Sequence, residues 1–163
     1  MTDEASAIFL ALEQSAFAAA VRQSPWLYPA ANVAHIVALV FFAGAAAVID
    51  VRLLGGLAAT APGRLLARAR GLAAAALAGM ALSGFMLFSA EASHIAANPV
   101  FRLKLALIAA GLANVAIYEF LAKPSVESLP PGASMPARAK IAGALSLGIW
   151  VTVAACGRSI AYF

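Results

Sequence analysis

Charged residues are scarce in this chain. They make up 11% of its 163 residues, whereas 64% are hydrophobic. A soluble domain of this length still exposes roughly a third of the surface of its unfolded chain. So few charged side chains cannot cover that surface. The scarcity of charge therefore excludes an ordinary soluble domain and predicts a protein surrounded by lipid.

Cysteine and dense basic runs are also nearly absent. Cys156 is the one cysteine, which excludes an intrachain disulfide. The net charge is +4, but the basic residues stand beside apolar stretches and form no basic face. Membrane topology explains them, and no nucleic-acid partner is expected. The absence of a P-loop, a nucleophile elbow and a zinc motif argues against a hydrolase or a nucleotide enzyme. The sequence otherwise leaves open whether the protein is an enzyme.

Four apolar stretches have the roughly 20 residues that a membrane-crossing helix requires. They predict an all-α integral membrane protein whose residues 1–163 form a single membrane domain, a bundle of four transmembrane helices. The predicted spans are residues 30–49, 71–90, 99–122 and 139–161. Asn98 followed by Pro99 is a favourable start for the third span, because asparagine caps helices and proline suits the first helical position.

The stretch 4–22 precedes these spans and is predicted to be an amphipathic helix lying in the membrane interface. Its apolar residues recur at near-helical spacing, but polar residues such as Glu13 and Arg22 make it a poor membrane span. The segment 24–29 follows, with two prolines that end the helix. Its tryptophan and tyrosine are typical of the headgroup level.

Basic residues near the span ends predict the orientation, because they are enriched on the cytoplasmic side. The loops after spans one and three carry seven basic residues, and the opposite side carries four. The seven are Arg52, Arg64, Arg68, Arg70, Lys123, Arg138 and Lys140, and the four are Arg22, Arg102, Lys104 and Arg158. We therefore expect a multi-pass protein of the bacterial inner membrane with both termini in the periplasm.

Ionisable residues within spans are candidates for function because they are costly in lipid. His35 lies about six residues inside span one and Lys104 about five inside span three, so both are expected roughly 9 Å below the outer membrane face. His94 and Arg158 stand at the outer ends of spans two and four. Two polar stripes are expected to face the bundle interior. One consists of Gly79, Ser83, Met86, Ala90 and His94, and the other of Lys104, Gly111, Asn114 and Tyr118.

This convergence suggests two cofactors. Histidines on facing helices can ligate haem iron, so His35 and His94 are candidate axial ligands of a haem b, with Arg102, Lys104 and Arg158 as partners for its propionates. The alternative is a Cu(I) site of His35, Met86 and Cys156, because imidazole and sulfur suit that ion. The structural alternatives are a helix-bridging hydrogen bond for His35 and plain packing for the two sulfur residues.

The charged residues at the opposite side have a structural interpretation. Asp50 and Arg52 are expected to form a helix-end anchor and a local ion pair. Glu119 is expected to pair with Lys123, four residues further along the helix.

Several segments carry a family resemblance that covers nearly the whole chain. They are His35-Ile36-Val37-Ala38-Leu39 continuing to Gly44, Asp50-Val51-Arg52-Leu53-Leu54-Gly55, Asn98-Pro99-Val100-Phe101-Arg102-Leu103-Lys104, and Gly157-Arg158. They resemble a family of bacterial four-helix membrane proteins without an assigned function.

The chain is also distantly similar to the CopD-type copper-resistance proteins and the HemJ-type protoporphyrinogen oxidases. That resemblance rests on a histidine followed by a glycine in the first span and a lysine at the start of the third. It implicates His35 and Lys104, and for the HemJ type it implies a role of His35 in haem binding. The tryptophan usual beside the first-span glycine is replaced by Phe41-Phe42.

The leading hypothesis is a haem-b-binding inner-membrane protein that transfers electrons near the periplasmic face. Its partners besides the lipid bilayer would be a redox protein or a quinone. The alternatives are a copper-handling membrane protein and a non-catalytic accessory subunit. A homo-oligomer and a hetero-complex are both compatible with the small-residue spans.

Overall fold

The computed structural model describes residues 3–163, with side chains from residue 6 onward. In this part of the chain every regular element is a helix and none is a strand. Four helices are long and apolar enough to cross a membrane: α3 (Leu27–Leu54), α4 (Pro62–Ala90), α6 (Pro99–Leu121) and α8 (Ala137–Ser159), which η1 (Ile160–Tyr162) extends. The predicted all-α class with four spans is confirmed, and the protein is a multi-pass membrane protein.

The first two long helices extend beyond the apolar stretches of the sequence. α3 continues past residue 49 to Leu54, and α4 begins at Pro62, well before residue 71. Hydropathy marks only the lipid-compatible part of a helix, whereas arginines can continue it because their long side chains reach toward the headgroups. Gly55 then ends α3 with φ +109°, a left-handed conformation that suits glycine.

The connections contain more helix than the sequence predicts. The segment between α4 and α6 forms α5 (Ala92–Ala97), and the proline-containing connection before α8 contains α7 (Lys123–Glu127). Asn98 caps α6 as predicted, because its Oδ1 accepts the N–H groups of Val100 and Phe101 at 2.9 and 3.2 Å.

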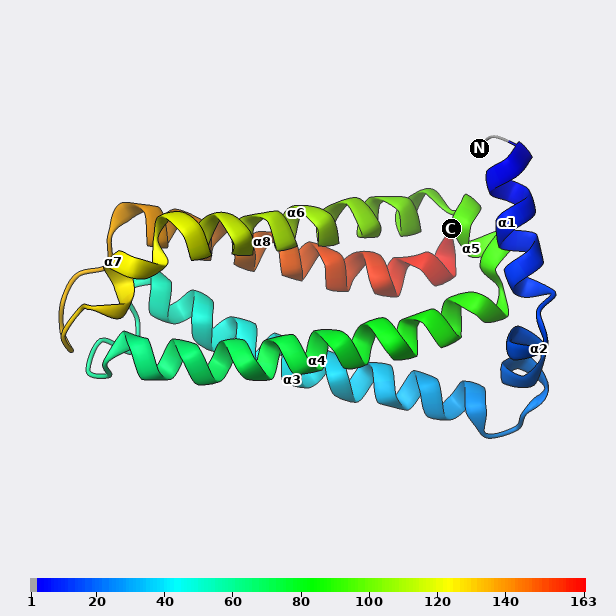
Figure 1. Cartoon of the computed structure of the whole chain (residues 1–163), viewed down its shortest axis with the longest axis horizontal. Helices are drawn as coiled ribbons and strands as arrows, with labels where there is room; N and C mark the ends of the chain where they lie inside the picture. Colours follow the sequence, from blue (N-terminus) through cyan, green and yellow to red (C-terminus); the bar gives the residue numbers. More distant parts are fainter. Residues whose placement is uncertain (1–2) are drawn as a thin grey trace.

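The long helices pack as two pairs joined through one contact. α3 packs on α4, α6 packs on α8, and α3 joins the pairs by packing on α8. α4 and α6 have little backbone contact along their lengths. Side chains connect them near both ends: Phe88 stacks on Phe101 with ring centres 5.3 Å apart, and Arg70 pairs with Glu119. Figure 1 shows α1, α2, α5 and η1 at one end of the bundle, called the terminal end here. The opposite end, with the α3–α4 connection and α7, is called the loop end.

Small residues permit these close helix contacts. A Cβ on Gly143 of α8 would lie 3.0 Å from the Cβ of Leu53 and 3.2 Å from the Asp50 carbonyl oxygen of α3. A Cβ on Gly111 of α6 would lie 2.8 Å from the Trp150 ring of α8. Small residues are known to let membrane helices approach closely, and these two glycines set the spacing of α8 from both its neighbours.

The predicted helix over residues 4–22 is two helices, α1 (Asp3–Glu13) and α2 (Ala16–Gln23). Ser15 separates them because its Oγ accepts the Ala18 N–H and starts a new helix. Figure 1 shows α1 lying across the terminal end. The Arg22 guanidinium donates to the carbonyl oxygens of Glu13 and Ala90 and so ties α2 to α1 and to the end of α4.

We predict that Gly143→Leu destabilises the bundle, whereas Gly148→Leu does not. The added side chain at Gly143 meets the α3 backbone, and overpacking of this kind costs about 1–3 kcal/mol. Gly148 lies on the same helix with no neighbour within 4 Å of the added Cβ. Helix loss during SDS titration, followed by circular dichroism, measures both variants. Equal effects of the two substitutions would contradict the close α3–α8 approach.

We predict that α1 detaches from α5 in acid. The Ser93 hydroxyl and N–H both donate to the Glu13 carboxylate and lower the pKa of Glu13 below its model-compound value of 4.5. Because the contact lowers the pKa of Glu13, the ionised carboxylate stabilises the contact fully at pH values above the pKa of the detached group. This stabilisation is lost as the pH falls through the lower pKa of the docked group. The protection factors of the α1 amides, which correct for the slower intrinsic exchange in acid, should therefore fall at low pH in the native protein. A Glu13→Gln variant should have the lower protection factors at every pH, without this pH step.

Candidate functional site

His35 lies in the terminal half of α3, where its side chain meets α4. Its Nδ1 is 3.0 Å from Ser83 Oγ, and that hydroxyl donates to the Gly79 carbonyl oxygen at 2.7 Å. A hydroxyl has one hydrogen, so Ser83 must accept from His35, and Nδ1 carries the proton. The Nε2 of the neutral ring therefore keeps a free lone pair. This is the arrangement typical of a metal-ligating histidine, whose other nitrogen donates to a protein acceptor.

Gly84 provides the space for this imidazole. A Cβ at that position would lie 3.1 Å from His35 Cε1. Any larger residue would press on the ring and change its position. The stripe of Gly79 and Ser83, predicted to face the bundle interior, is confirmed on this side of α4: Ser83 is buried, and a Cβ on Gly79 would contact Ala38 of α3.

Lys104 adds a cation from the other helix pair. Its ammonium acts electrostatically on His35 of α3 and on Cys156 of α8. Lys104 Nζ lies 3.5 Å from the position of a Cβ on Gly157, so the lysine side chain lies against α8. The structure thus places Lys104 within electrostatic range of His35 and Cys156, which stand on two other helices. We call this group, with Ser83, the terminal-half site.

The other predicted site residues lie elsewhere. His94 is exposed on α5, where it interacts electrostatically with Glu13 of α1. Arg102 is exposed near the start of α6. Arg158 is exposed and stacks on the Tyr162 ring, 4.9 Å from its centre. These three residues occupy the surface of the terminal end, so they do not line the bundle interior with His35.

A copper site receives no additional ligands from the fold. Within residues 3–163, no group of three His, Cys, Asp or Glu side chains is placed to hold a metal ion. The copper hypothesis therefore depends on Met86 joining His35 and Cys156. Met86 is half-buried on α4 and Cys156 is buried on α8.

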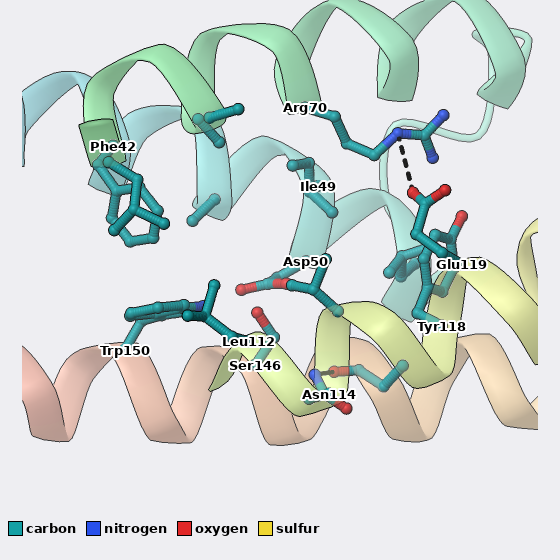
Figure 2. Close-up of a pocket in the computed structure, with 17 residues that line it drawn as sticks. Phe42, Ile49, Asp50, Arg70, Leu112, Asn114, Tyr118, Glu119, Ser146 and Trp150 are labelled. Atoms are coloured by element: carbon teal, nitrogen blue, oxygen red, sulfur yellow. Dashed lines mark hydrogen bonds and ion pairs between the residues drawn. The ribbon is translucent and has the colours of Figure 1, made fainter. Parts of the chain in front are cut away.

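A second site, which the sequence did not predict, is a cavity of about 320 Å³ in the loop half of the bundle. Figure 2 shows its residues, which come from all four long helices and are mostly apolar. Its polar lining residues are Asp50 of α3, Arg70 of α4, Asn114, Tyr118 and Glu119 of α6, and Ser146 of α8. Of the predicted interior stripe of Lys104, Gly111, Asn114 and Tyr118, the last three are buried as predicted, and Lys104 is half-buried.

Asp50 is the most unusual of these polar residues. It is 1% exposed, and neither carboxylate oxygen has a hydrogen-bond partner among the described residues. The Ser146 hydroxyl points toward it in Figure 2 and is close enough to act on the carboxylate, but the distance and angles are not those of a formed hydrogen bond. The predicted ion pair between Asp50 and Arg52 is wrong, because residues two apart on a helix face different directions. Arg52 instead donates to the Thr60 carbonyl oxygen at 3.2 Å.

The charged residues at the cavity's loop end neutralise one another. Arg70 pairs with Glu119 at 3.5 Å and with Glu127 at 2.6 Å, and Lys123 pairs with Glu119. The predicted Glu119–Lys123 pair is therefore confirmed. Two cations meet two carboxylates in this network, so it leaves no charge to compensate Asp50.

Sequence reasoning missed the cavity because Asp50 stands at the end of an apolar stretch, where a carboxylate is usually solvated. One signal was available. Phe42, Ala46 and Asp50 recur every four residues and so lie on one stripe of the helix. Because Phe42 and Ala46 pack against neighbouring helices, a carboxylate on the same stripe is expected to face the interior of the bundle as well.

The fold and these sites define a four-helix, multi-pass membrane protein with polar groups enclosed between its helices. The chain belongs to the family of unknown function DUF6644, whose model matches residues 25–163. The match begins after α2 and includes all four long helices, with His35, Asp50 and Lys104. Neither the curated proteins nor the solved structures contain a match to this chain.

We predict a single tautomer for His35. In protein with ¹⁵N-labelled histidine, Nδ1 of His35 should be protonated and Nε2 should not. Ser83→Ala removes the acceptor and should shift the population toward the other tautomer. The chain has two histidines, so a His94→Gln variant identifies the His35 signals. A proton on Nε2 in the native protein would contradict the ligand geometry.

Proposed function

We propose that this protein binds haem b in the membrane and transfers electrons near the face at its terminal end, with His35 as the axial ligand. The free Nε2 of His35 supports this proposal most directly. The Nδ1–H bond to Ser83 holds the ring in one orientation and increases the basicity of Nε2. A bound haem iron would supply one-electron redox chemistry.

The cations of the terminal half suit a cofactor that carries carboxylates. Lys104 interacts electrostatically with the His35 ring and is half-buried, so it can pair with one propionate. Arg102 and Arg158 are exposed at the terminal end, where the second propionate would reach water. α4 and α6 have little backbone contact. Phe88 of α4 stacks on Phe101 of α6 near the terminal end, with ring centres 5.3 Å apart, so a planar cofactor entering there would stack on these rings or displace them.

The proposal has one axial histidine. His94 is exposed beside Glu13 and does not share the interior with His35, so it does not serve as the second ligand. The seven basic residues near the loop end favour a cytoplasmic loop end in a bacterial inner membrane. The terminal-half site would then exchange electrons with a periplasmic redox protein or a membrane quinone.

We predict a Soret band in protein purified after haem-replete expression. His35→Ala should abolish the band, because it removes the ligand, whereas His94→Ala should leave its position and intensity unchanged. Lys104→Gln should keep the ligand and lower the haem occupancy. Absorption spectra of the four proteins at equal concentration measure these effects.

Absence of the band from the native protein, or a band unaffected by His35→Ala, would refute the proposal. Metal analysis of the same samples tests the alternatives. Stoichiometric copper that is lost in Met86→Leu would favour copper handling. A colourless, metal-free protein that purifies with a larger partner would favour an accessory subunit.

A further inference from the structure

We infer that the loop-half cavity binds a lipid-borne amphiphilic amine, with its ammonium group at Asp50 and its apolar body between the helices. This site is separate from the proposed haem site and shares no residue with it. The inference rests on three observations: the unpaired carboxylate, the neutral surroundings and the route from the lipid.

The Asp50 carboxylate is incomplete in this structure. It is almost fully buried, it faces the cavity, and both oxygens lack a partner among the described residues. A buried carboxylate without a partner is costly, and a cation with hydrogen-bond donors removes most of that cost. An ammonium group provides both the charge and the donors.

Among the side chains of residues 6–163, no basic group pairs with Asp50. Arg70, the cavity's one basic lining residue, is engaged by Glu119 and Glu127. Arg52 is buried and donates to the Thr60 carbonyl oxygen through one nitrogen; its other two guanidinium nitrogens have no partner among the described residues and make no hydrogen bond to Asp50. The cavity therefore presents an uncompensated acid within apolar walls, which favours a cationic ligand over an anionic one.

The walls suit the apolar body of such a ligand. The cavity volume of about 320 Å³ is at the lower end of the range for small-molecule pockets. Phe42 and Trp150 form an edge-to-face pair, with ring centres 4.6 Å apart, and both line the cavity. Aromatic faces near a carboxylate favour organic cations further, through cation–π attraction.

The route from the lipid lies between α4 and α6. These helices have little backbone contact between the Phe88–Phe101 stack near the terminal end and the Arg70–Glu119 pair near the loop end. Leu112 and Val115 of α6 and Ala74 of α4 line the cavity and are also exposed. In a bilayer, such residues border both the cavity and the acyl chains. A ligand dissolved in the membrane can therefore enter sideways without crossing the protein.

The test uses two caged probes of the same shape, 1-adamantylamine and the neutral 1-adamantanol. The chain has two tryptophans, so the full-length Trp26→Phe protein in detergent reports binding through Trp150 emission alone. We expect saturable binding of the amine and at least about tenfold weaker binding of the alcohol. Asp50→Asn should weaken amine binding by at least about thirtyfold, as expected for loss of a buried charge partner.

The control for charge is Glu91→Gln, which removes an exposed carboxylate at the terminal end and should leave the affinity unchanged. Ala73→Phe fills the cavity and should abolish binding while Asp50 is retained. If Asp50→Asn does not fold, Ala73→Phe tests whether the amine binds in this cavity. Wild-type affinity of Ala73→Phe for the amine overturns the inference.

Two further results would overturn it. Binding of the alcohol as tight as that of the amine would show an apolar cavity without cation recognition, and so would normal binding of the amine by Asp50→Asn. No response of Trp150 to the amine would also reject the site. None of these measurements requires haem, so failure here and failure of the proposed haem function are distinguishable.

Discussion

Hydrocarbon supplies no hydrogen-bond partner, so each polar group within the spans must find one inside the protein. The helices satisfy the backbone, and several side chains then use helix carbonyl oxygens. Ser83 donates to Gly79 on its own helix, whereas Asn114 donates to Ala142 at 3.0 Å and links α6 to α8. Ser83 and Asn114 meet this requirement and hold the fold together. His35 and Asp50 do not meet it fully, and we propose a ligand at each.

The two sites differ in how they meet this requirement. In the terminal half, Ser83 forms a hydrogen bond with Nδ1 of His35. The other ring nitrogen, Nε2, keeps its lone pair within electrostatic range of Lys104. In the loop half, neither oxygen of Asp50 has a hydrogen-bond partner within the part of the chain that the structure describes, although paired charges stand at the end of the same cavity. One site therefore presents a base next to a cation, and the other presents an acid next to a neutral network.

The arrangement of the helices connects the loop-half cavity to the bilayer. α3 contacts α4 and α8 and holds the two pairs together, with Gly143 allowing the close approach to α8. Between α4 and α6 the pairs have little backbone contact, and the Phe88–Phe101 stack and the Arg70–Glu119 pair connect them near the two ends. A symmetric bundle would have closed this side, so the asymmetry in packing produces the lateral route to the loop-half cavity.

The sequence by itself determined that the protein is surrounded by lipid and has four spans, because both depend on composition. It also determined the Asn98 cap and the Glu119–Lys123 pair, because these involve residues within one helical turn of each other. It also predicted similar depths for His35 and Lys104, since depth follows from the helical rise. It did not reveal the break between α1 and α2 at Ser15. The apolar residues keep helical spacing across this position, so the capping hydroxyl of one serine gives no clear signal in the sequence.

Only the tertiary structure decided which of these polar residues meet. It separated His94 from His35, turned Asp50 away from Arg52, and enclosed Asp50 among residues from four helices. Those outcomes depend on the rotation of each helix about its axis and on glycine-sized contacts between helices. Neither is specified by hydropathy, because lipid accepts an apolar helix in any rotation.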